Sequence, residues 1–186
     1  MDNKANDTLR KTVVLVGMMG SGKSSIGRLL ADELGVTFKD ADTEIEAAAA
    51  MSIAEIFETH GEAYFRDGER RVIERLLADP PHILATGGGA FCTADTRSLI
   101  KQTACSVWLN VEIQELVRRV NKRPGKRPLL NKGDPETILS DLLAQRRADY
   151  AQADIMIASD NDSHKSTVDD IIAELSEFGI VRAEGA

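Results

Sequence analysis

The sequence contains only two cysteines and no apolar run long enough for a secretory signal or a membrane span. Cys92 and Cys105 are too few and too isolated for a disulfide framework, and neither stands at metal-ligand spacing from another cysteine or a histidine. We expect both to be inert thiols. The absences together predict a cytoplasmic protein that does not act at a membrane.

An excess of positive charge is also missing. The chain has 23 Lys and Arg against 30 Asp and Glu, a net charge of -7, which argues against a broad surface for nucleic acid or anionic lipid. Its 186 residues, with 42% hydrophobic and 28% charged, have the composition of a globular protein. We therefore expect residues 1–186 to form a single domain, a monomer whose partners are small molecules.

Short apolar runs alternate along the chain with stretches of helical periodicity. Alternation of this kind is typical of an α/β fold in which helices cover both faces of a mostly parallel sheet, in three layers. The strand-like runs are Val13–Val16, Val36–Lys39, His82–Thr86, Cys105–Asn110 and Ala153–Ser159.

Two segments depart from this alternation. Residues of about 41–78 have helical character, broken at Met51-Ser52 and at Gly61, and are long for a connection between strands, so we interpret them as a helical substrate-binding segment. Residues of about 121–134 are basic and rich in Pro and Gly, which is typical of a lid loop over an active site.

The stretch "VVLVGMMGSGKSS" satisfies the phosphate-loop pattern G-x-x-x-x-G-K-[ST], after an apparent strand and before an apparent helix. Its backbone N–H groups can bind phosphate, Lys23 can reach the outer phosphates of ATP or GTP, and the Ser24 hydroxyl can ligate Mg²⁺. The alternative is a glycine-rich turn with a chance Lys-Ser pair. The residues assigned to nucleotide binding are Gly20, Ser21, Gly22, Lys23, Ser24 and Ser25.

A second nucleotide pattern, "NKGD" at Asn131–Asp134, resembles the guanine-recognition motif of GTPases. It lies in the basic loop rather than at the end of a buried strand. We interpret it as a turn that caps a helix beginning near Pro135.

Polar residues and glycines follow two of the strand-like runs. Asp40 and Asp42 come after the second run, and at the carboxyl edge of a parallel sheet one could hold a metal while the other orients or deprotonates an attacking hydroxyl. The alternative is that either residue only caps a helix. After the third run, Gly87, Gly88 and Gly89 would let the backbone approach a ligand, or would form a flexible turn.

The motifs "GMMGSGKSSIGRLLA", "DADTEIE", "SIAEIFETHGEAYFRDGE", "TGGGA", "RPLL" and "QRRADY" occur in this order, and together they resemble the shikimate kinase family from about Lys11 to about Ile180. The resemblance implies a P-loop fold with a five-stranded parallel sheet. It also implies transfer of the γ-phosphoryl group of MgATP to the 3-hydroxyl of shikimate, on the pathway to chorismate and the aromatic amino acids.

The resemblance assigns a role to individual residues. Lys23 would hold the β- and γ-phosphates, Ser24 and Asp40 would hold Mg²⁺, and Asp42 would bind and deprotonate the acceptor. Arg66, positioned by Glu69, and Arg146 would hold the shikimate carboxylate, and the three glycines would face the substrate. Arg119 would lie near adenine, and Arg127 would be the lid arginine that stabilises the transferring phosphoryl group.

Two other functions are compatible with a phosphate loop. One is a different small-metabolite kinase, such as a gluconate kinase, which the three glycines and the paired arginines disfavour. The other is a nucleotide-binding regulatory module without catalysis. His60, His82 and His164 have no metal or catalytic partner at recognisable spacing, and we expect surface or packing roles for them.

Overall fold

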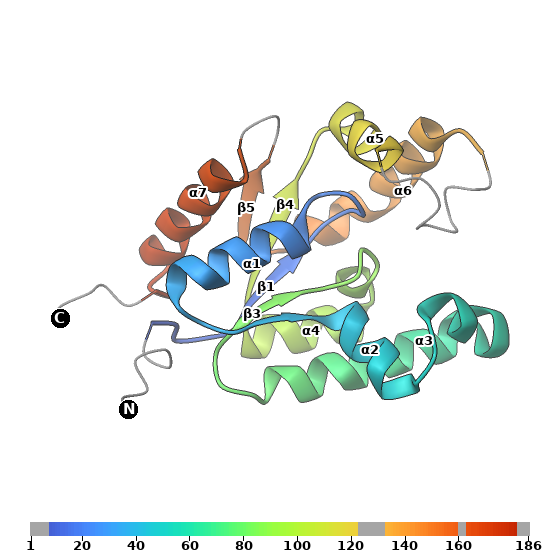
Figure 1. The fold of residues 1–186 in the computed structure, drawn as a ribbon, viewed down its shortest axis with the longest axis horizontal. Coiled ribbons are helices and arrows are strands. Elements are labelled where there is room, and N and C mark those ends of the chain that lie inside the picture. Colours follow the sequence, from blue (N-terminus) through green and yellow to red (C-terminus); the bar gives the residue numbers. More distant parts are fainter. Residues whose placement is uncertain (1–7, 123–132, 160–162, 182–186) are drawn as a thin grey trace.

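The structure is a computed structural model that describes residues 8–122, 133–159 and 163–181. Five parallel strands form one sheet in the order β2-β3-β1-β4-β5 (Figure 1). The strands are β1 (Val13–Val16), β2 (Phe38–Asp40), β3 (Ile83–Ala85), β4 (Cys105–Asn110) and β5 (Ile155–Ala158). The predicted five-stranded parallel sheet is thus confirmed.

Helices follow each strand and cover both faces of the sheet (Figure 1). They are α1 (Lys23–Leu34), α2 (Ala41–Ala49), α3 (Ile53–Leu77), the short 3₁₀ helix η2 (Ala90–Cys92), α4 (Ala94–Thr103), α5 (Ile113–Asn121), α6 (Pro135–Tyr150) and α7 (His164–Glu177). In the described ranges, no helix combines the length and apolar character needed to span a membrane.

The central strand β1 contributes to two separate cores. Because successive side chains of a strand point to opposite faces, Val14 and Val16 pack on one side with residues of α3, α4, α5 and α6, and Val13 and Leu15 pack on the other with residues of α1 and α7. All four side chains are buried, which explains why a strand covered on both faces appears as a continuous apolar run.

The strand order places the two glycine-rich turns side by side. β1 pairs with β3 in the register Leu15 to Ala85, and the backbone N–H of Thr86 donates to the carbonyl oxygen of Leu15 at 3.3 Å. The chain leaves β1 toward one face and β3 toward the other, so a crevice lies between the carboxyl ends of these strands. This crevice is where a parallel α/β sheet binds its ligands.

The predicted breaks in the helical segment are confirmed. α2 ends at Ala49, and α3 begins after Ser52, whose hydroxyl and the Glu55 carboxylate form a reciprocal capping box. Gly61 has φ of 81°, which kinks α3. The predicted cap at Asp134 is confirmed as well, since its carboxylate accepts from the Thr137 N–H at 2.9 Å; Asn131 and Lys132 lie outside the described residues.

Two details differ from the predictions. β2 begins two residues later than expected, at Phe38, and runs through Asp40, so α2 begins at once with Ala41. The pattern also fails to indicate α4, because Leu99 and Ile100 are its only large apolar residues and the polar Thr96 supplies another buried position.

Candidate active site

The turn between β1 and α1 surrounds the side chain of Lys23. Its Nζ donates hydrogen bonds of 2.8 Å to the carbonyl oxygens of Gly17 and Met18. Gly22, with φ of 94°, is the N-cap of α1, and a Cβ at Gly17 would lie 2.8 Å from the carbonyl oxygen of Leu109. The backbone conformation requires glycine at position 22, and the lack of space requires it at position 17. The turn therefore has the strand-before, helix-after setting that a phosphate loop needs.

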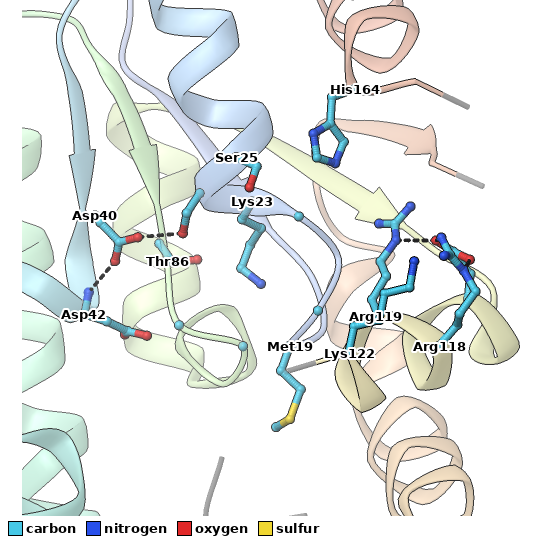
Figure 2. Close-up of a pocket in the computed structure, with 16 residues that line it drawn as sticks. Met19, Lys23, Ser25, Asp40, Asp42, Thr86, Arg118, Arg119, Lys122 and His164 are labelled. Carbon is cyan, nitrogen blue, oxygen red and sulfur yellow. Dashed lines mark hydrogen bonds and ion pairs between the residues drawn. The ribbon is translucent and has the colours of Figure 1, made fainter. Parts of the chain in front are cut away.

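Ser24 and Asp40 meet across the first two strand-to-helix turns. The Ser24 hydroxyl donates to Asp40 Oδ2 at 2.7 Å, and Asp40 Oδ1 accepts from the backbone N–H of Asp42 at 3.1 Å (Figure 2). Asp40 is thus the N-cap of α2 and the partner of Ser24 at the same time. The interpretation of this aspartate as a helix cap is confirmed, and its functional role stays a prediction that the contact with Ser24 supports.

Asp42 lies in the first turn of α2, beside the phosphate loop (Figure 2). Burial raises the pKa of its carboxyl above the ordinary value of 3.8, and repulsion by Asp40 raises it further, while Lys23 and Arg66 oppose the shift by less. A carboxylate with a raised pKa is a better proton acceptor than an ordinary aspartate. Its environment therefore suits the predicted role.

The three glycines after β3 make room for side chains of the protein itself. A Cβ at Gly87 would lie 2.8 Å from Asp42 Oδ1, and a Cβ at Gly89 would lie 2.8 Å from Cζ of Arg66. A Cβ at Gly88 would lie 3.4 Å from Arg146 Nη1. Since none of the three has a positive φ, space rather than backbone conformation explains them. The triglycine gathers the aspartate and both arginines around one turn.

Arg66 is held by acidic neighbours on its own helix. Its Nη1 donates to Glu69 Oε2 at 2.7 Å, and its Nη2 lies 3.4 Å from Glu62 Oε1. Glu69 is 1% exposed, and burial raises its pKa against the opposing effect of Arg66. Burial lowers the pKa of Arg66, but the charges and hydrogen bonds of Glu69 and Glu62 outweigh it and raise that pKa overall. The ion pair fixes the guanidinium beside Gly89.

A cavity of about 470 Å³ opens between the phosphate loop and the triglycine. Ten of the residues assigned from the sequence line it: Gly20, Gly22, Lys23, Ser24, Ser25, Asp40, Asp42, Gly87, Gly88 and Arg119. Figure 2 shows the two aspartates on one side of Lys23 and a group of basic side chains on the other. The cavity thus has an acidic end and a basic end.

Some assigned residues do not line this cavity. Ser21 belongs to the phosphate loop but is fully buried, with its Oγ 3.4 Å from Lys23 Nζ. Arg66 and Arg146 lie next to the triglycine instead, and Gly89 is its third residue. Arg127 and most of the predicted lid lie outside the described residues.

Arg119 connects the phosphate loop to the turn after β5. Its Nη1 donates to the carbonyl oxygen of Ser21 at 3.3 Å, and its Nη2 donates to that of Ser159 at 3.4 Å. Glu115 holds it in place, with Arg119 Nε 2.5 Å from Oε1. Hydrogen bonds from Arg118 and Arg119 lower the pKa of Glu115 to about 2, although burial opposes the shift.

Six cavity residues were not assigned from the sequence. They are Met19, Thr86, Glu115, Arg118, Lys122 and His164. His164 is exposed, as expected of a surface residue, but it is also the first residue of α7 and faces the basic end of the cavity (Figure 2). Its place at the start of the helix that follows the last strand, at the sheet edge where ligands bind, is the signal that could have identified it.

The chain matches the family model of shikimate kinase over residues 19–176. It is 54% identical over 168 residues to a shikimate kinase of Rhodopseudomonas palustris, an alignment that covers 90% of this chain and 82% of that protein. Among solved structures, it is similar to shikimate kinase from Acinetobacter baumannii in complex with shikimate. That likeness has a TM-score of 0.88 and 36% identity, and covers 95% of this chain and 98% of the other.

A gluconokinase of Sinorhizobium meliloti is also similar in structure, with a TM-score of 0.62 over 92% of this chain and 94% of the other. At 18% identity, this likeness shows a common fold alone.

Proposed function

The chain belongs to the shikimate kinase family, and from this premise we propose how its own residues carry out the reaction. The protein is an ATP-dependent kinase that transfers the γ-phosphoryl group to the 3-hydroxyl of shikimate, a step on the pathway to chorismate. The cavity between the phosphate loop and the triglycine is the proposed place of transfer.

In this proposal, ATP places its phosphates on the backbone N–H groups of residues 20–25. Lys23, which the loop carbonyls already hold at its centre, supplies positive charge to the β- and γ-phosphates. Arg119 lies at the basic end of the cavity, where it would lie near the adenine. The observation that supports this placement is the position of the loop at the N-terminus of α1.

Ser24 and Asp40 fit a magnesium ion. Both present oxygen atoms, which Mg²⁺ prefers, and a nucleotide-bound Mg²⁺ needs only one or two groups from the protein because phosphates and water complete its shell. Ser24 would be a direct ligand and Asp40 would hold the outer shell. When bound, the ion neutralises charge on the β- and γ-phosphates.

Asp42 accepts the proton of the attacking hydroxyl in this proposal. The raised pKa of its carboxyl, due first to burial and then to Asp40, and its position beside Lys23 carry the assignment. The carboxylate would orient the 3-hydroxyl of shikimate toward the γ-phosphate and take up its proton as the new P–O bond forms, while the bond from the γ-phosphorus to the bridging oxygen breaks and ADP leaves.

Two arginines hold the acceptor. Arg66, fixed by Glu69, lies beside Gly89 and Arg146 lies beside Gly88, and forked guanidinium groups suit a planar carboxylate. Gly87, Gly88 and Gly89 would form the adjoining wall. Arg127, assigned from the family resemblance, would stabilise the transferring phosphoryl group, a contribution worth about 10³-fold or more in related reactions.

The proposal is tested by ADP release from the purified protein with MgATP and either shikimate, gluconate or no acceptor, with the product identified by its mass. We expect phosphoshikimate, formed only with shikimate. Equal ADP release in all three reactions would contradict the proposed acceptor site and favour the nucleotide-binding module instead. A monomeric state and a cytoplasmic location stay predictions from the sequence.

A further inference from the structure

Tyr150, the last residue of α6, lies with its hydroxyl directly behind the triglycine. The side chain is 0% exposed, and the hydroxyl donates a hydrogen bond to the carbonyl oxygen of Gly88. Its ring stacks on Trp108 of β4, with 5.8 Å between centroids and 29° between planes. A tyrosine hydroxyl that is this deeply buried normally has a hydrogen-bond partner, and here the partner is the Gly88 carbonyl.

Several parts of the site meet at this hydroxyl. Met18 of the phosphate loop places its Sδ 3.8 Å from the oxygen. Burial raises the pKa of Tyr150 well above its ordinary value, the Cys92 thiol adds to the shift, and the Arg146 guanidinium opposes it by less. The hydroxyl therefore remains a protonated donor at any pH at which the protein works.

Gly88 itself lies between the nucleotide side and the acceptor side. A Cβ there would be 3.3 Å from the backbone nitrogen of Met19 and 3.4 Å from Nη1 of Arg146. The Tyr150 hydroxyl fixes the carbonyl of this one glycine. A shift of the hydroxyl would consequently move the triglycine relative to both the phosphate loop and α6.

We propose that Tyr150 is a positioning residue that couples the nucleotide site to the acceptor site. Through Gly88 and Met18 it keeps the triglycine, Arg146 and the phosphate loop in one arrangement, so that nucleotide binding prepares the site for shikimate. Coupling of this kind is reciprocal, because each ligand must favour the other by the same factor. The inference rests on the proposed function, which assigns Gly88 and Arg146 to the acceptor.

The test is the dissociation constant of shikimate, measured with and without saturating ADP, in the unsubstituted protein and in Tyr150→Phe. Phenylalanine keeps the ring on Trp108 and removes only the hydroxyl. We expect shikimate binding in the presence of ADP to weaken about fivefold to tenfold, the effect of one buried hydrogen bond. In Tyr150→Phe, the gain in shikimate affinity that ADP produces should largely disappear. The dissociation constant of ADP measured without shikimate should change less than about twofold.

Two variants serve as controls. Leu139→Val removes packing from the same helix, away from the hydroxyl, and reports what a general loss of stability does to binding. Tyr64→Phe alters the exposed tyrosine of α3. Both should keep the coupling between ADP and shikimate. If Tyr150→Phe matches Leu139→Val in every constant, its role is structural and the inference is wrong.

Arg146→Ala separates this inference from the proposed function. If Arg146→Ala weakens shikimate binding while Tyr150→Phe does not, the acceptor site stands and the positioning role of Tyr150 fails. If Arg146→Ala leaves shikimate binding unchanged, the assignment of the acceptor site is wrong, and the role of Tyr150 falls with it.

A second measurement does not depend on the folding of Tyr150→Phe. The chain has two tyrosines, so 3-fluorotyrosine in a Tyr64→Phe background labels position 150 alone. The fluorine resonance should shift when ADP binds and shift again when shikimate binds. A resonance that neither ligand moves would overturn the inference.

Discussion

The hydroxyl of Ser24 donates a 2.7 Å hydrogen bond to the carboxylate of Asp40, and this bond joins the phosphate loop to the start of the helical segment. The same carboxylate caps α2 and thereby positions Asp42. One aspartate thus links the proposed metal site with the proposed proton acceptor.

Ser24→Ala should raise the Mg²⁺ concentration needed for half-maximal activity by about 10–100-fold, because one oxygen ligand is lost. Asp40→Asn should have an effect of similar size. Activity is measured by ADP release at fixed ATP and varied Mg²⁺. The control is Ser176→Ala, whose hydroxyl bonds a carbonyl of its own helix α7. An unchanged Mg²⁺ requirement in Ser24→Ala would remove this serine from the metal site.

Gly89→Ala should raise the KM for shikimate by about tenfold or more while changing the KM for ATP little, because the new Cβ overlaps the guanidinium of Arg66. The matched control is Gly68→Ala on α3, where a Cβ meets no atom within 4 Å. Steady-state kinetics with each substrate varied would check both variants. Equal KM values for shikimate in the two variants would contradict the stated role of Gly89.

Glu69→Gln should raise the KM for shikimate by about fivefold to tenfold, because the amide keeps the shape of Glu69 but not the charge that fixes Arg66. Glu62→Gln is the control: its side chain is 69% exposed and lies farther from the same arginine, at 3.4 Å. We expect it to have little effect. If both variants behave alike, Glu69 does not position Arg66 for the substrate.

Asp42→Asn should make the folded protein more stable at neutral pH. The folded state raises the pKa of Asp42 and so binds its proton more tightly than the unfolded state does. Stability therefore falls as pH rises from 3.8 through the raised pKa, and asparagine removes this loss. We therefore expect a higher melting temperature for Asp42→Asn at pH 7, and in a domain of this size each kcal/mol of added stability raises it by about 2–4 °C.

The gain from Asp42→Asn should shrink as the pH is lowered toward 3.8, where the wild-type carboxyl becomes neutral. Asp67 is the opposite case, because hydrogen bonds from Arg71 and Arg70 lower its pKa. The variant Asp67→Asn should therefore not stabilise the protein. Thermal unfolding at several pH values measures both variants. A lower melting temperature for Asp42→Asn at pH 7 would show that its charge is well satisfied in the fold.

The parts of the site that the sequence predicted are encoded locally. The phosphate loop combines Gly22, Lys23 and Ser24 in one motif, and Asp40 and Asp42 directly follow a strand, so position in the sheet follows from position in the chain. The alternation of strands with helices was likewise expected, apart from α4, whose buried face includes a threonine.

The other parts depend on contacts between distant residues. Tyr150 and Gly88 are 62 residues apart, and Arg119 reaches Ser21 across 98, so neither contact has a local pattern. The triglycine was expected to admit a ligand, but its lack of side chains also admits Asp42, Arg66 and Arg146. Such requirements for space become apparent only when the packed side chains are seen.

The most direct test of the account is a single-turnover measurement of phosphoryl transfer from ATP to shikimate in Asp42→Asn, with the dissociation constant of ATP measured on the same sample. If Asp42 accepts the proton of the acceptor hydroxyl, transfer should slow by about 10²–10⁴-fold while ATP binding stays within about twofold of the wild type. Transfer at the wild-type rate would contradict the proposed chemistry at this site.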